Sequence, residues 1–301
     1  MTLETVSQCN DFFSVRTLNP LASVIRLPAV KDIPGQLQFG FNALLVRGRT
    51  DFQPTCLGRK ECDFSDGALV ALQPNVQVDP CIWEYGKEKA DGLLLCFHNR
   101  LFNPCLKGKM STRYSFFRYG IDESLQLSLR ERITLEKEID DIENELCWGF
   151  DEFSCTILAE RIRLLLDYVS RFHKRQFILR HDRNQKLVNR ADQWIEDFFR
   201  SGKARYVPLP TARDFAGMFG CTSDYFNDLL KHETGKCTED YVNSKRISFA
   251  VVQLRKGDRD IKDVAADLGF PTDQVFCSLF RKLRGESPED ILSKSGAEFL
   301  N

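Results

Sequence analysis

The sequence lacks the features that mark a membrane-spanning or exported protein. No stretch approaches the roughly 18 uninterrupted apolar residues that a membrane helix needs. The segment from Met1 to Phe13 has no basic stretch followed by an apolar one, so we expect no signal peptide. These absences predict a cytoplasmic chain with no membrane partner.

Disulfide and zinc patterns are also absent from the sequence. The 11 cysteines are odd in number and lie singly between Cys9 and Cys277, with no CxxC pair and no Cys/His cluster at zinc spacing. This pattern favours reduced thiols in the cytosol over a disulfide framework. It leaves a redox-sensing thiol open but singles out no cysteine for that role.

Signatures of catalysis are equally scarce. The chain has 4 histidines, and His98 is the only one in the first hundred residues. A catalytic metal inside a β-barrel needs two or three histidines and a carboxylate that converge on one point. No GxSxG, GxGxxG or P-loop motif occurs, and no nucleophile is paired with a base. We therefore expect no catalytic residues, no metal ligands and no cofactor, with a metal-dependent enzyme as the alternative.

The net charge does not indicate a nucleic-acid partner, because 42 basic residues are balanced by 43 acidic ones. From Lys186 to the end of the chain there are 18 of each sign, so a DNA-binding domain here must gather its basic residues on one face. The stretch from Arg171 to Arg190 contains seven basic residues and one acid, Asp182. We interpret its centre, residues 173–185, as a basic, solvated linker between two domains.

The first hundred residues have the pattern of short strands separated by turns. Period-two alternation predicts a half-buried strand with these residues on one face: Leu37, Phe39, Phe41, Ala43 and Leu45. Asp-Gly turn signals at 66–67 and 91–92 each precede an apolar run. Strands bounded in this way indicate a β-sandwich or a small barrel.

Two amphipathic helices are predicted next, at about 123–146 and 150–180, where apolar residues recur at helical spacing. The apolar stripe of the first helix consists of Leu135, Ile139, Ile142 and Leu146. That of the second helix consists of Leu158, Ile162, Leu165, Val169 and Phe172. The stripes can pack within the chain or form a seam with a second copy, and the sequence leaves both alternatives open.

The last third of the chain contains an internal duplication. Ala216 and Gly220 recur as Ala265 and Gly269, 49 residues later. Phe226, Leu230 and Gly235 recur as Phe276, Phe280 and Gly285, 50 residues later. One residue is therefore inserted in the second copy, near Pro271.

Each copy predicts a helix, a tight turn and a second helix, at about 211–235 and 261–285. Threonines at 211, 222 and 272 can cap helix starts, and the four repeated glycines can end helices. The expected inward-facing residues are Phe215, Ala216, Phe219, Phe226, Leu229, Leu230, Ile261, Val264, Ala265, Leu268, Phe276, Phe280 and Leu283. Duplicated helix-turn-helix units indicate DNA binding, with a helical bundle that has no DNA role as the alternative.

A linker helix is expected between the copies, at about 239–256, where Gly and Pro are absent. Eighteen helical residues span about 27 Å. With the width of the units they join, the two second helices would lie about 34 Å apart, one turn of DNA. This spacing would let both units enter successive major grooves on one face of a duplex.

Residues 186–293 resemble the AraC/XylS family of bacterial transcriptional regulators. The resemblance rests on IKDVAADLGF at 261–270, on the later positions Phe276, Phe280, Gly285 and Ser287-Pro288, and on DYFNDLLKHETG at 224–235. More loosely, CDFSDGALVALQP at 62–74 and GLLLCFH at 92–98 are similar to the cupin-like sensor and dimerisation domain of such regulators.

The resemblance completes the expected fold, an α+β chain of two domains. Residues 1–172 would form a cupin-like β-barrel or sandwich with the two appended helices. Residues 186–301 would form an all-α domain with two helix-turn-helix subdomains on a linker helix.

The resemblance also implies which side chains face DNA. The first recognition helix would present Ser223, Asp224, Asn227, Asp228 and Lys231. The second would present Thr272, Asp273, Gln274, Ser278 and Arg281. Gln274 suits adenine, whereas Arg281 and Lys231 suit phosphate. Because phosphates repel carboxylates, Asp224 and Asp228 must accept from cytosine or turn aside.

The expected function is sequence-specific transcriptional regulation, with double-stranded DNA as the partner. The resemblance further implies a homodimer, contact with RNA polymerase and control by a small-molecule effector in the N-terminal domain. That domain could equally be a dimerisation platform alone. An adaptor that does not bind DNA is the remaining alternative.

Overall fold

The computed structural model describes residues 1–27, 36–48, 57–78, 82, 92–102, 113–149, 151–256 and 259–298. The chain divides into two compact units, Met1–Arg180 and His181–Asn301. The division lies inside the range expected to be a linker, but that range is helical. Helix α4 (Ser154–Leu179) and helix α5 (His181–Arg200) leave only Arg180 between them. The segment contains no Gly or Pro, the two residues that most disfavour helix.

The N-terminal unit is built on two sheets. The five-stranded sheet has the order β2 (Ala22–Arg26), β7 (Gly92–Phe97), β4 (Asn42–Gly48), β5 (Gly67–Leu72) and β8 (Leu125–Leu127), with all neighbours antiparallel. The three-stranded sheet consists of β1 (Thr2–Leu3), β3 (Leu37–Phe39) and β6 (Gln77–Val78). A short helix, α1 (Val6–Phe12), follows β1, and a short 3-10 segment, η3 (Asn99–Leu101), follows β7.

The two sheets share one apolar core, which contains the whole predicted face from Leu37 to Leu45. That face belongs to two strands of different sheets, because the chain bends at Gly40, where a Cβ would overlap the carbonyl oxygen of Glu4. The prediction of a half-buried strand is wrong, since all seven residues of β4 are buried. A second core covers their other face. Of the turn predicted at 91–92, Asp91 lies outside the described residues.

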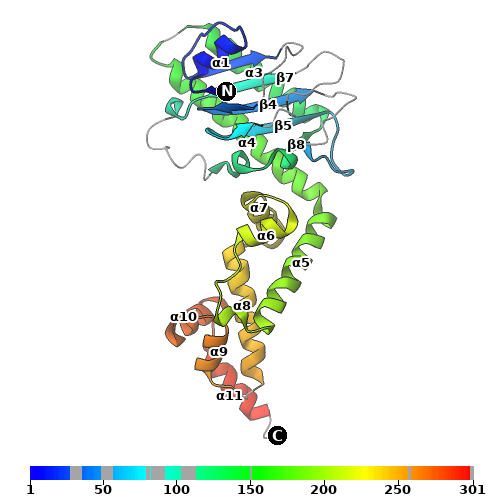
Figure 1. Ribbon diagram of the computed structural model, residues 1–301, viewed down its shortest axis with the longest axis vertical. Coiled ribbons are helices and arrows are strands. Elements are labelled where there is room, and N and C mark those ends of the chain that lie inside the picture. The colour runs from blue at the N-terminus through cyan, green and yellow to red at the C-terminus, as the bar shows by residue number, and fades with distance from the viewer. Residues whose placement is uncertain are drawn as a thin grey trace. The chain divides into compact units, whose positions relative to one another are not determined.

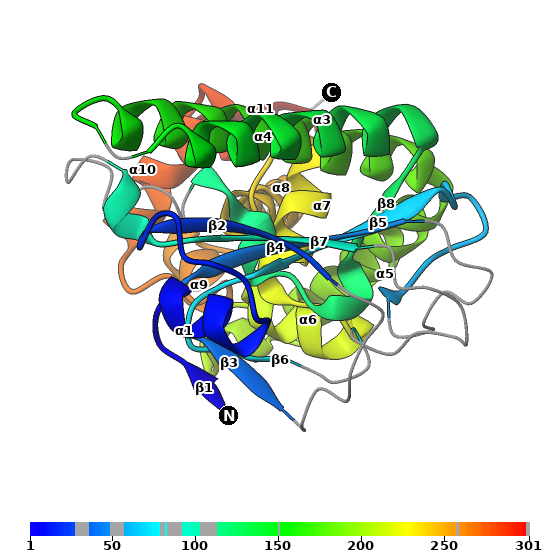
Figure 2. The same cartoon turned by 90° about the horizontal axis from the view of Figure 1, so that it is seen from above.

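Helices α3 (Leu129–Cys147) and α4 form that second core (Figure 2). Every residue of the two predicted apolar stripes is buried there, together with Leu44, Val46 and Leu95 of the sheet. The stripes therefore pack within the chain. Helix α3 begins at a capping box, in which Ser128 and Glu131 satisfy each other's backbone amides.

Two arginines, Arg175 in α4 and Arg180 at its C-cap, fasten this helix to the unit through charge pairs. Arg180 donates to both carboxylate oxygens of Asp63 at 2.8 and 2.5 Å, and their side chains are 3% and 0% exposed. Arg175 likewise donates to both oxygens of Glu131. His173 lies between stacked and edge-on rings of the same region, and burial, with nearby Arg180 and Arg175, lowers its pKa to about 3. This histidine is therefore neutral at physiological pH.

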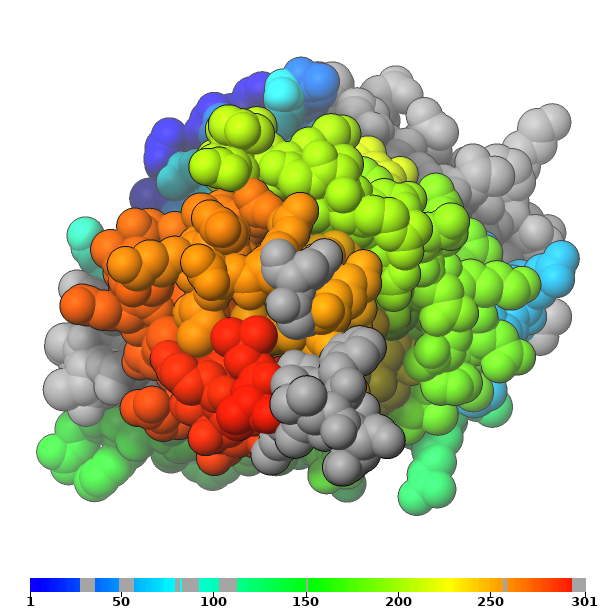
Figure 3. All heavy atoms as spheres, turned by 90° about the horizontal axis from the view of Figure 1, so that it is seen from below, coloured from blue at the N-terminus to red at the C-terminus, as the bar shows by residue number. Residues whose placement is uncertain are grey.

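The C-terminal unit is helical throughout its described part (Figure 1). After α5 come the 3-10 turn η7 (Lys203–Arg205), α6 (Ala212–Phe219), α7 (Ser223–Thr234), α8 (Thr238–Arg255), α9 (Ile261–Asp267), α10 (Asp273–Arg284) and α11 (Pro288–Glu298). Within this unit, α6 and α7 lie near the start of α8, while α9, α10 and α11 lie near its end. Figure 3 shows the surface formed by the α9–α11 region in orange and red. None of the helices in the described ranges combines the length and the apolar character required to cross a bilayer.

Candidate DNA-binding surface

The two helix-turn-helix units repeat the same local geometry. Gly220 and Gly269 have φ of +64° and +74°, the left-handed conformation that ends a helix. In both turns the backbone amide of the residue after the glycine donates to an alanine carbonyl: Cys221 donates to Ala216 O at 3.1 Å, and Phe270 donates to Ala265 O at 2.9 Å. The two copies in the sequence therefore form turns with the same backbone hydrogen bond.

The second helix of each unit starts at a threonine, as expected. The Thr222 hydroxyl accepts from Tyr225 N, and that of Thr272 accepts from Val275 N. Between the helices, Phe215 stacks on Phe226 with ring centroids 5.1 Å apart. Most of the expected inward-facing residues are buried, but Phe219 and Ile261 only partly so. Leu283 is 43% exposed, contrary to expectation.

Helix α10 presents one polar face to solvent. Its buried residues are Phe276 and Phe280. At about 100° per residue, Ser278 lies opposite this pair, with Gln274 and Arg281 beside it. All three are exposed. Of the other expected contacts, Thr272 is exposed at the N-cap, and Asp273 is half-buried toward the protein side.

The same face carries two residues that the sequence analysis did not single out. Val275 is 48% exposed, which is unusual for a large apolar residue and suits contact with a thymine methyl group. Lys282 is also exposed. With Arg281 and Arg284 it gives the last turn of α10 three basic residues, against one acid, Asp273, in the first turn. The sequence signal for this basic turn was the spacing of Arg281, Lys282 and Arg284, which follow Gln274 and Ser278 along the same helix.

Helix α7 has a different outward face. Its buried residues are Tyr225, Phe226, Leu229 and Leu230. By the same periodicity Asp224, Asp228 and Lys231 lie on the other side of the helix, where Lys231 is exposed and the two aspartates are half-buried. Ser223, at the first position of the helix, is half-buried. The first unit therefore offers a surface much less attractive to phosphate than the second.

Asn227 has a structural task that its position in a recognition helix did not suggest. Its side-chain oxygen accepts from the backbone N of Thr238 at 2.9 Å and from the Thr238 hydroxyl at 3.1 Å. Thr238 is the first residue of α8, so Asn227 satisfies an unpaired amide at the start of that helix. Its acceptor atom is engaged inside the protein and is not available to a base.

Helix α7 is also fixed to α5 through Glu233, whose side chain is 2% exposed. The carboxylate accepts from Asn184 at 2.9 Å and Gln185 at 3.0 Å, and it lies 2.8 Å from His181 Nδ1. Burial raises the pKa of Glu233, but these hydrogen bonds outweigh it and leave the pKa below its usual value. Helix α5 was not predicted as such, although Val188, Ala191, Ile195 and Phe198 recur at helical spacing.

The second unit is fastened to α8 by a buried arginine. Arg246 is 5% exposed, and its guanidinium lies 3.3 Å from the centroid of the Phe270 ring. Its Nε donates to the Leu268 carbonyl oxygen at 2.7 Å, at the end of α9. Burial lowers the pKa of Arg246 to about 10, so it remains a cation at neutral pH. Phe270 belongs to the turn that carries the extra residue of the second copy, which gives this insertion a packing role.

Two units of helix, turn and helix at the ends of one connecting helix define a class of protein, the DNA-binding regulators with duplicated readers. Residues 215–294 match a family model described as a helix-turn-helix domain. The chain is 28% identical over 108 residues to the regulatory protein SoxS of Escherichia coli K12, covering 36% of this chain and 94% of SoxS.

A longer relative has the same character. Over 141 residues the chain is 28% identical to the transcriptional activator RhaS of Citrobacter koseri, covering 47% of this chain and 48% of RhaS. The matched segment thus spans about half of that protein. Among solved structures, the C-terminal domain of AraT, a response regulator from Geobacillus stearothermophilus, is 23% identical with a TM-score of 0.31, covering 36% of this chain and 84% of that one. The C-terminal unit is an AraC-type helix-turn-helix domain, similar in sequence to the regulators SoxS and RhaS.

Proposed function

We propose that this chain recognises a specific duplex sequence by placing α10 in one major groove and α7 in the next. The observation that carries the proposal is the exposed face of α10, where a glutamine, a serine and a valine stand beside two basic residues. Such a face can read base edges with its first turns and hold phosphate with its last. Helix α8, with 18 residues or about 27 Å, sets the separation of the two readers.

The two readers are proposed to contribute unequally. Helix α10 carries Gln274 for adenine and Arg281 for phosphate or guanine. Helix α7 has Lys231 as its one central cation, while Asp224 and Asp228 limit its approach to phosphates. Most of the affinity is therefore assigned to α10. Helix α7 adds contacts where its carboxylates meet cytosine amino groups, which would make it the more sequence-dependent reader.

A homodimer is part of the proposal, with a second copy covering the outer face of α3 and α4. That face exposes these apolar residues: Ile133, Trp148, Phe153, Ile157 and Leu164. Exposed acids, Glu152 and Glu160, lie toward the start of α4, and exposed bases, Arg171 and Lys174, toward its end. Two copies of α4 related by a twofold axis would run antiparallel and pair opposite charges.

We further propose that a small molecule binds in the N-terminal unit and controls the protein, that the chain contacts RNA polymerase, and that it resides in the cytoplasm. These three points rest only on the resemblance to known regulators. The test for an effector is the affinity of the full chain for its DNA with and without the small-molecule fraction of a cell extract. An unchanged affinity would leave the N-terminal unit as a dimerisation platform.

A non-enzymatic role is likewise proposed. His98, the histidine of the expected barrel, accepts from Arg100 N through Nδ1 at 3.0 Å and so caps the 3-10 segment η3. Within the described ranges, no three metal-ligating side chains gather. Metal analysis of the purified protein tests this point, because a stoichiometric transition metal would restore the enzyme alternative.

The DNA proposal is tested by selecting genomic fragments with the purified full chain and then titrating the selected site with variants. Gln274→Ala should reduce discrimination against altered bases by about 1–3 kcal/mol, while binding to unrelated DNA stays the same. Arg281→Ala should weaken binding to all sequences and reduce the slope of log affinity against log salt by about 1.

Arg284→Ala is the matched control, because it removes an arginine from the same helix but from another face, where it lies 3.9 Å from Glu286. It should change neither quantity. Light scattering in the same titrations should give two chains per selected site. A salt-independent affinity, or equal effects of Arg281→Ala and Arg284→Ala, would contradict the docking of α10.

A further inference from the structure

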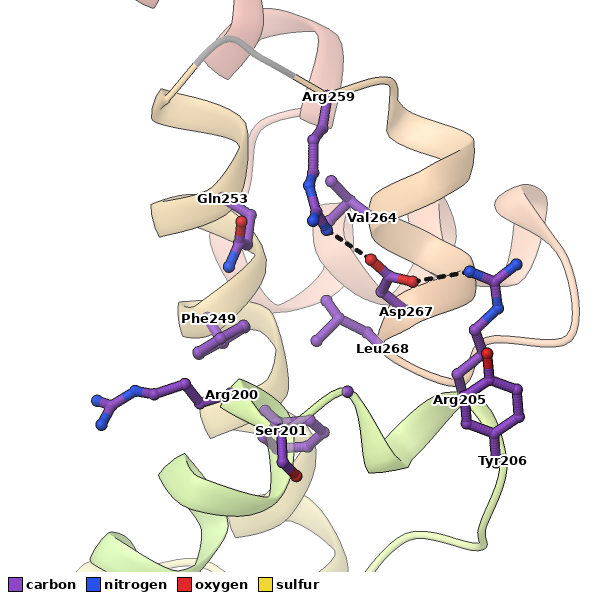
Figure 4. Close-up of a pocket in the computed structure, with 12 residues that line it drawn as sticks. Arg200, Ser201, Arg205, Tyr206, Phe249, Gln253, Arg259, Val264, Asp267 and Leu268 are labelled. Carbon is purple, nitrogen blue, oxygen red and sulfur yellow. Dashed lines mark hydrogen bonds and ion pairs between the residues drawn. The ribbon is translucent and has the colours of Figure 1, made fainter.

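A cavity of about 310 Å³ lies inside the C-terminal unit, away from the residues expected to meet DNA (Figure 4). It is enclosed by the end of α5 and η7 on one side, by α8 on the second and by α9 on the third. These elements belong to different parts of the sequence, so the cavity exists only once the unit has folded. Its volume falls at the lower end of the range for small-molecule sites.

The floor of the cavity is apolar. Phe199, Val264 and Leu268 line it and are 3%, 1% and 2% exposed, and the half-buried Phe249 adds a second aromatic ring. Because those three side chains are already almost fully covered, Phe249 is the apolar floor residue with area left for a hydrocarbon or aromatic body to cover. A hydrated inorganic ion gains nothing from it.

The rim of the cavity is cationic. Arg205 and Arg259 share a single carboxylate, that of Asp267, at 3.1 and 2.5 Å (Figure 4). A third lining arginine, Arg200, lies 3.9 Å from Glu196 and 3.8 Å from Asp197 at the surface of α5. Asp267 is the one acid among the lining residues, which therefore carry three positive charges and one negative charge.

We propose that this cavity binds a small organic anion, a carboxylate with an aromatic or aliphatic body. The body would lie against the Phe249 and Tyr206 rings, and the carboxylate would accept guanidinium hydrogen bonds from Arg205 and Arg259. It would compete with the carboxylate of Asp267, which pairs with the same two guanidinium groups. Because Asp267 is the last residue of α9, the ligand would act on the helix that supports α10.

The geometry favours this ligand over a phosphate of the DNA backbone. Backbone phosphates bind to protruding cations and to amide groups, whereas here two guanidinium groups sit above a buried apolar floor. The aromatic side chain of Tyr206, which is 82% exposed at the rim, adds a further surface for a planar body. The site is independent of how the recognition helices meet DNA.

The test is photolabelling of the purified full chain with 4-azidobenzoate, followed by peptide mapping. Labelling should saturate and map to residues 199–206, 249–253 and 264–268. Excess benzoate should suppress it, while benzyl alcohol and inorganic phosphate should not. Arg205→Gln combined with Arg259→Gln should lower labelling at a fixed subsaturating concentration about 10-fold, because two charged hydrogen bonds are lost.

Two further variants separate the site from general effects. Gln253→Trp fills the cavity from α8 without touching an ion pair and should also abolish labelling. Arg183→Gln removes an exposed arginine of α5 outside the cavity and should leave labelling unchanged. Labelling confined to residues 1–180, insensitivity to the arginine and tryptophan variants, or equal suppression by phosphate would overturn the proposal.

Discussion

Replacing Gly269 with alanine is expected to undock the second helix-turn-helix unit. Gly269 has φ of +74°, which costs an alanine about 1–2 kcal/mol. In addition, a Cβ at this position would overlap the carbonyl oxygen of Ala204 in η7. Backbone cannot move aside as a flexible side chain can, so we expect a total loss of about 3 kcal/mol or more. Hydrogen exchange of α9 and α10 should accelerate accordingly, and DNA affinity should fall with it.

Gly285→Ala is the control for this substitution. Gly285 has nearly the same φ, +76°, but no atom lies within 4 Å of the Cβ that it would gain. An alanine at this position therefore loses only the free energy of the strained backbone, about 1–2 kcal/mol. The difference between the two variants isolates the contact with η7. Equal losses would contradict the packing of the second unit against this turn.

Removing the carboxylate of Asp63 should strongly destabilise the N-terminal unit. Its partner Arg180 is 3% exposed, and Asp63→Ala would remove the carboxylate that pairs with this buried guanidinium. Loss of one partner from a buried pair costs about 3–5 kcal/mol. Urea unfolding of the full chain, followed by hydrogen exchange of strands β4 and β5, measures the change.

Two variants bracket this result. Asp140→Ala breaks an ion pair with Arg26 in which both side chains are more than half exposed, 51% and 57%, and should cost less than about 1 kcal/mol. Asp63→Ala combined with Arg180→Met removes both charges and should recover much of the stability lost by the single change. If the double variant were as unstable as Asp63→Ala, the cost would not come from the stranded cation.

Local chemistry explains why the duplicated reader could be predicted. Threonine caps, left-handed glycines and apolar spacing each depend on residues only a few positions apart, so a short stretch of sequence is enough to recognise them. The same reasoning gives the outward positions of Gln274, Ser278 and Arg281. Helix α11 was missed, although Ser287, Pro288 and the acids that follow are a helix start of the same kind.

The features that escaped prediction depend on partners far apart in the chain. Asn227 accepts from a residue 11 positions away, and Glu233 is held by side chains 48 to 52 positions away. Arg246 is buried against a ring of the inserted turn, and no periodicity marks a cation for burial. Strand β4 was predicted to be half-buried because the helices that cover its second face begin only at Leu129 and Ser154. Long-range packing, rather than local preference, decides these positions.

The central claim is that α7 and α10 enter successive major grooves from one side of the duplex, and guanine methylation interference on the selected DNA site tests it directly. The account predicts two clusters of interfering major-groove positions for each bound chain, about 10 base pairs apart on one face. Gln274→Ala or Arg281→Ala should weaken one cluster and leave the other. A single cluster per chain, or two clusters on opposite faces, would contradict the claim.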